Sequence, residues 1–261
     1  MPRALQDYFA AGDARIIAWE AYSRFADEFD WTVPSKMKLY DESIYAFGGQ
    51  GSEEERFAKF EVIYTNLKGD WQVFRSSHGH EAHWDAREIF AAIQKEFSSF
   101  GWESGVTLLT PLNGEQEATL LKSFDAMARL KSNSGYPTMA VSKFLHFYNP
   151  SLFPIFDTEV IWGRVFHCFR NEYRSFCSGA GLDHRADGAS FLQNYMRWGG
   201  FLLSAAGPEY MSHFIDWLRE ELPPKQFKRL GEPLLERLYA TAFELTAIGA
   251  AVAEETKSIV R

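Results

Sequence analysis

Apolar residues recur along most of the chain at the spacing of an amphipathic helix. Ile17, Ala21, Phe25 and Phe29 follow one another at intervals of four, behind Asp13 as a candidate N-cap. The same period continues to the end of the chain, interrupted by glycine, proline and polar runs. It predicts helices over residues 14–29, 41–47, 52–69, 80–98, 115–130, 137–148, 158–176, 189–205, 209–221 and 233–257.

Strand patterning is weak by comparison. Trp71–Phe74 is the best strand candidate, and one short strand cannot organise a sheet. Ser52 and Glu55 have the spacing of a capping box, which adds a start signal to the helix that ends at Gly69. We therefore predict a compact, multi-helix, all-α fold with little or no sheet.

The length and composition fit a folded core. The chain has 261 residues, 46% of them hydrophobic, which allows one large domain or two lobes. We place the lobes at residues 1–112 and 113–261. With 35 acidic against 27 basic residues the net charge is −8, so any nucleic-acid site has to be a local patch.

The chain carries no sign of secretion or membrane insertion. Asp7 precedes any apolar run at the N-terminus, and no stretch approaches the roughly 18 apolar residues that a span needs. Cys168 and Cys177 suit reduced thiols rather than a disulfide framework. We expect a soluble, cytoplasmic protein without membrane contact, disulfide or cofactor.

Histidines cluster at one place, His78, His80 and His83. Their H-x-H-x-x-H spacing resembles the metal signature of metallo-β-lactamase-like hydrolases, but Ala82 stands where that family has a metal-binding Asp. On a helix, His80 and His83 share a face and could still bind one zinc ion. The alternative is a polar helix start, and a metal-dependent hydrolase is kept as one of three hypotheses.

A second segment, residues 131–166, has an order of residues with chemical meaning. Gly135 forms a turn, a helix begins at Pro137, and a loop bounded by Pro150 and Pro154 leads to Asp157 at the start of the next helix. An Asp at that place lies beside free backbone N–H groups, at the positive end of the helix dipole. The simplest interpretation of Asp157 is an N-cap.

This segment resembles the second half of the helix-hairpin-helix DNA glycosylases of base-excision repair. The resemblance implies an all-α, two-lobed fold, with Gly135 in a hairpin whose amides bind a DNA phosphate and Asp157 as the catalytic carboxylate. Asn133 replaces the first hairpin glycine, and the Pro154–Asp157 stretch is one residue longer than in that family. Pro137 occupies the position of the lyase lysine, so Schiff-base chemistry is not expected.

The local net charge of this region is compatible with binding to phosphate groups. Residues 131–176 hold five basic and three acidic side chains, an excess of two positive charges in an acidic chain. We expect Lys143, His146 and Arg164 to contribute to nucleic-acid binding. Lys143 and His146 would form a polar face, and Arg164 could instead pair with Glu159.

Whether the protein is an enzyme stays open, and a non-enzymatic interaction or dimerisation module is the main alternative. In that case the final helix, with Leu234, Leu235, Leu238, Tyr239, Ala242 and Phe243, would pack on a partner or a second copy. Asp157 in an open cleft with exposed basic neighbours would favour action on nucleic acid. Asp157 buried against its own helix would favour the module.

Overall fold

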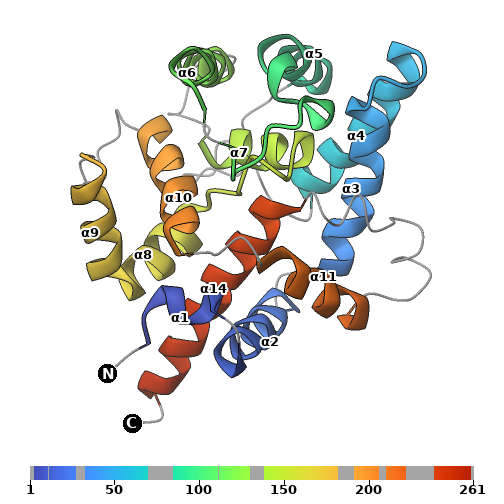
Figure 1. Ribbon diagram of the computed structural model, residues 1–261. Coiled ribbons are helices and arrows are strands. Elements are labelled where there is room, and N and C mark those ends of the chain that lie inside the picture. The colour runs from blue at the N-terminus through green and yellow to red at the C-terminus, as the bar shows by residue number, and fades with distance from the viewer. Residues whose placement is uncertain are drawn as a thin grey trace. The chain divides into compact units, whose positions relative to one another are not determined.

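The computed structural model describes residues 3–10, 12–27, 33–69, 85–110, 112–129, 138–181, 191–205, 210–221 and 238–259. Every regular element within these ranges is helical, which confirms the predicted all-α fold (Figure 1). The candidate strand Trp71–Phe74 lies outside the described residues. No helix in the described ranges is long and apolar enough to cross a membrane.

Each long helix overlaps one of the predicted segments, although several begin or end at other residues. They are α2 (Asp13–Asp27), α3 (Val33–Phe47), α4 (Glu53–Gly69), α5 (Ala86–Glu96), α6 (Gly114–Arg129), α7 (Thr138–Tyr148), α10 (Phe191–Ala205), α11 (Tyr210–Glu221) and α14 (Tyr239–Ile259). The Ser52–Glu55 capping box is present, because the Ser52 N–H donates to Glu55 Oε2 at 2.8 Å and the Glu55 N–H donates to Ser52 Oγ at 3.2 Å.

Three places differ from the predicted helices. A short helix, α1 (Leu5–Phe9), was not predicted, and α3 begins at Val33, well before the predicted segment 41–47. Pro34 does not break α3, because it lies in the first turn, where a missing N–H removes no helical hydrogen bond. The predicted helix 158–176 is divided into a π-helix, η3 (Thr158–Val165), and two α-helices, α8 (Phe166–Cys168) and α9 (Arg170–Gly179).

The chain forms two compact units. Unit 1 contains residues Met1–Lys36 and Phe156–Arg261, and unit 2 contains Met37–Ile155. The chain therefore leaves unit 1 once and returns to it just before Asp157. The boundary that we placed between residues 112 and 113 falls inside unit 2, in the loop before α6, and α6 packs on both α5 and α7.

Helix α14 is the centre of unit 1, where it lies along α2 and also contacts η3, α1 and α10. Figure 1 shows α14 in red beside α2 in blue. Trp19 on α2 fixes this packing by donating its indole N–H to Thr246 Oγ1 at 2.8 Å. At the closest point Gly249 faces the backbone of Ala18, where only a hydrogen fits.

Helix α7 is the most buried element described in unit 2, and residues 140–150 are all buried. It packs on α4 and α6 through aromatic rings such as Phe144, which lies 5.8 Å from Phe60 between ring centroids. Asn149 closes the helix, and its amide donates to the carbonyls of Phe100 at 2.8 Å and Val106 at 3.2 Å. These bonds hold the end of α7 against the segment that follows α5.

Candidate functional site

Asp157 is the N-cap of η3, as its position in the sequence predicts. One carboxylate oxygen, Oδ1, accepts the N–H of Glu159 at 3.0 Å and the N–H of Val160 at 3.2 Å. Only 9% of the residue is exposed. The carboxylate therefore satisfies two N–H groups that a helix start leaves without a partner, and little of it reaches solvent.

The helix that Asp157 begins is of a rare type. The Phe166 N–H donates to the carbonyl of Ile161, five residues earlier, whereas the first turn keeps an ordinary bond from the Ile161 N–H to the Asp157 carbonyl at 2.7 Å. π-helical segments are uncommon, and many of them lie at functional sites. Sequence periodicity cannot distinguish this segment from an α-helix over so few turns.

Lys143 and His146 lie in unit 2, and the face of α7 that we expected to be polar is buried. Lys143 is 2% exposed and His146 is 0% exposed. His146 Nδ1 lies 2.7 Å from the Phe153 carbonyl, which can only accept, so Nδ1 carries a proton. In neutral His146, Nε2 then accepts from the Tyr40 hydroxyl at 2.5 Å. Neither Lys143 nor His146 is positioned in this structure to contact a phosphate in solvent.

Arg164 lies on η3 in unit 1 and is engaged within that unit. Its guanidinium donates to Glu255 on α14 at 2.9 Å and lies 4.9 Å from the ring centroid of Phe25. The sequence suggested Glu159 as the acidic partner, whereas the structure supplies a residue 91 positions further along the chain. Such a pairing depends on helix packing, so local sequence could not reveal it.

The remaining candidates lie outside the described residues: Gly135 and the three histidines His78, His80 and His83. Among the residues that are described, no group of three or more His, Cys, Asp or Glu side chains could hold a metal ion.

Two exposed arginines escaped the sequence analysis. Arg170 and Arg174 lie four residues apart on α9, and both are exposed. The buried residues Phe169, Tyr173 and Cys177 define the inward side of this segment, next to the arginines on the helix surface. The 3.6-residue period of the predicted helix 158–176 could have identified them, because it separates these arginines from the apolar positions.

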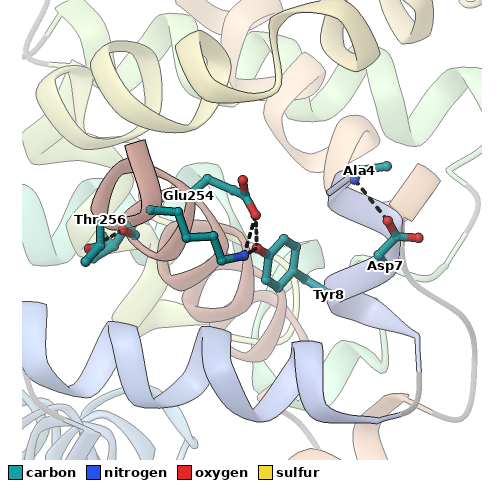
Figure 2. A network of polar contacts seen from close by, with 7 residues as sticks. Ala4, Asp7, Tyr8, Glu254 and Thr256 are labelled. Carbon is teal, nitrogen blue, oxygen red and sulfur yellow. Dashed lines mark hydrogen bonds and ion pairs between the residues drawn. The ribbon is translucent and has the colours of Figure 1, made fainter. Parts of the chain in front are cut away.

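Figure 2 shows a polar network that joins α1 to α14 in unit 1, with the Tyr8 hydroxyl facing the Glu254 carboxylate. Tyr8 donates to Glu254 Oε1, and Lys257 donates to the same oxygen at 2.7 Å. Burial alone would raise the pKa of Glu254, but the hydrogen bonds from Lys257 and Tyr8 outweigh it and lower that pKa. Burial and the Glu254 carboxylate raise the pKa of Tyr8. These shifts keep Tyr8 a neutral donor to a charged acceptor.

Cys168 and Cys177 are free thiols, as predicted. Burial, with the carboxylates of Glu254 and Glu255 nearby, raises the pKa of the Cys168 thiol to about 12.

Because the thiolate is the reactive form, we expect Cys168 to react with an aromatic disulfide reagent at pH 8 at least about a hundredfold more slowly than an ordinary thiol. Denaturant should expose two thiols, with or without reductant. A thiol that reacts within seconds in the folded protein would contradict this assignment.

The final helix does not present the surface that we expected. Leu238, Ala242 and Phe243 are each 0% exposed, because α14 is surrounded by other helices of unit 1. Leu234 and Leu235 lie outside the described residues. Leu238 just before α14, and Ala242 and Phe243 on it, therefore belong to the core of their own unit, whereas Tyr239 is only partly buried.

No family model matches the chain, and none of the curated proteins or solved structures compared with it matches either. Function therefore has to be inferred from the geometry of the described residues and from the chemistry of the segment around Asp157.

Proposed function

We propose that this protein binds nucleic acid through a local basic surface, and that Asp157 stabilises its helix instead of acting in catalysis. The proposal depends on which basic side chains are exposed in the glycosylase-like segment and in the helices that follow it. Lys143 is buried and Arg164 pairs with Glu255, whereas Arg170 and Arg174 remain exposed in a chain of net charge −8. A local cationic surface of this kind suits a phosphate backbone.

Asp157 supports the non-catalytic part of the proposal. A carboxylate that stabilises a positively charged sugar has to face the bound nucleotide. The Asp157 side chain instead lies against its own helix, with 9% of the residue exposed and two backbone N–H groups bound to one oxygen. Its capping role accounts for the local geometry without a ligand.

An interaction module built on the final helix has less support, because most described apolar residues of α14 are already buried within unit 1. Catalysis at Asp157 has one observation in its favour, the π-helix that it begins. Measurements of binding, base release and stability together separate these functions from simple binding.

The test combines binding, base release and stability. We expect the wild type to bind short DNA or RNA at low salt, with affinity that falls steeply as salt rises because bound counterions are released. We expect no base release from damaged or mismatched duplexes. Asp157→Asn should leave the free energy of unfolding almost unchanged because Asn also caps helices, whereas Asp157→Ala should lower it by about 0.5–2 kcal/mol.

Two results would overturn the proposal in different ways. Base release by the wild type that Asp157→Asn abolishes, with unchanged thermal melting, would make Asp157 catalytic. Failure of the wild type to bind DNA or RNA of either strandedness at low salt would remove the nucleic-acid function. Titrations by fluorescence anisotropy, base-release assays, and melts of all three proteins decide between them.

A further inference from the structure

One exposed face in unit 1 carries positive charge without a described acidic partner. We name it the arginine strip and define it as Arg170 and Arg174 on α9, extended by His167 on α8 and bordered by Asn171. All four residues are exposed. At 1.5 Å per residue the two arginines are about 6 Å apart along the helix axis, and they share one side of the helix.

Several other surface cations in the described chain are paired with acids. Arg87 pairs with Glu54 at 2.8 Å, Lys59 with Glu42 at 2.9 Å, and Arg219 with Asp216 at 2.5 Å. Within the described residues, neither Arg170 nor Arg174 has a hydrogen-bonded or ion-paired acid. A ligand anion at the arginine strip would therefore displace no internal ion pair.

The acidic residue closest in sequence points elsewhere. Glu172 lies between the two arginines, but at 100° per residue its direction is about 160° away from each of them. Its carboxylate contributes to the raised pKa of Cys168, which places it near that thiol. Glu172 therefore lies on a different side of α9 from the arginine strip.

Packing holds the helix beneath the arginine strip in place. Tyr173 stacks on Phe166 at 3.9 Å between ring centroids, with 12° between the ring planes, and also contacts Phe201 of α10 edge-on at 5.5 Å. Cys177, one turn further on, is 0% exposed. The backbone that carries both arginines is thus anchored by aromatic contacts, and binding has to order only the side chains.

We infer that the arginine strip is the surface that contacts the phosphodiester backbone of a nucleic acid. This inference rests on the proposed function and assigns it to particular residues. Each guanidinium presents several N–H donors in a planar fork that matches phosphate oxygens. Contacts of this kind bind the backbone and carry no base-sequence information.

The test measures binding of a short fluorescein-labelled duplex, and of single-stranded DNA and RNA of the same sequence, by the full chain. Arg170→Glu/Arg174→Glu is expected to weaken binding at least about tenfold and to lower the slope of log affinity against log salt by about 2. Arg170→Lys/Arg174→Lys retains the charge and should retain most of the affinity. Lys68→Glu/Lys122→Glu is the matched control, because both lysines are exposed and it changes the net charge equally.

Each outcome decides a separate point. Equal losses in the arginine and lysine double variants, with wild-type binding intact, would overturn the arginine strip and leave the proposed function standing. No binding by the wild type to any of the three probes would overturn both. Equally tight binding of poly-glutamate by the wild type, lost in Arg170→Glu/Arg174→Glu, would assign the strip to acidic proteins instead. Thermal melts of every variant confirm that the loss is not unfolding.

Discussion

Replacing Gly249 by alanine is expected to destabilise the protein by roughly 3 kcal/mol, although alanine is the better helix former. A Cβ at residue 249 would lie 1.9 Å from the Ala18 carbonyl oxygen and 2.7 Å from the Ala18 carbonyl carbon. These atoms belong to the backbone of α2, so no side-chain rotation relieves the clash. The helices must separate, and the buried surface between α2 and α14 loses its close packing.

The sign of this result is informative, because helix propensity alone predicts a gain of about 1 kcal/mol. Gly69→Ala provides the control: it lies at the end of α4, and nothing is within 4 Å of a Cβ added there. Urea denaturation of both variants measures the free energy of unfolding. If Gly249→Ala proved as stable as Gly69→Ala, the close approach of α2 and α14 would be wrong.

The second large effect is expected at a buried ion pair in unit 1. Lys36 Nζ lies 3.3 Å from Glu244 Oε1, and the two side chains are only 3% and 4% exposed. Glu244→Leu should lower the free energy of unfolding by about 3–5 kcal/mol, because it leaves the Lys36 ammonium buried without its carboxylate. Tyr22, whose ring centroid lies 5.6 Å from Nζ, cannot replace that charge, because burial raises the pKa of its hydroxyl.

The double variant Lys36→Met/Glu244→Leu tests whether the lost stability comes from the unpaired charge or from altered packing. Removal of both charges should recover most of the lost stability, since a buried ion pair is often no more stable than apolar side chains of similar volume. Lys59→Met on the exposed Lys59–Glu42 pair serves as a control, with an expected loss below about 1 kcal/mol. A double variant that is as unstable as Glu244→Leu would show that the loss does not come from an uncompensated charge.

Local features of the fold could be predicted from sequence because their causes lie within one or two helical turns. The apolar period located the long helices, Ser52 and Glu55 formed the predicted capping box, and Asp157 capped the predicted helix start. A cap and the groups that it satisfies are within three residues of each other, so a single sequence contains the whole interaction. The start of α3 was missed because Pro34 is compatible with a first helical turn as well as with a loop.

The tertiary structure decided which polar residues are available for function. Lys143 and His146 had the spacing of a polar face, but packing within unit 2 buries both, and Arg164 is paired with Glu255 from a distant helix. Glycine is required at residue 249 only because the backbone of Ala18, far away in sequence, lies against it. Burial and ion pairing depend on contacts between segments that are distant in sequence, and hydrophobic periodicity does not show which segments meet. Those contacts bury Lys143 and His146, which the sequence suggested as nucleic-acid ligands. They leave Arg170 and Arg174 exposed.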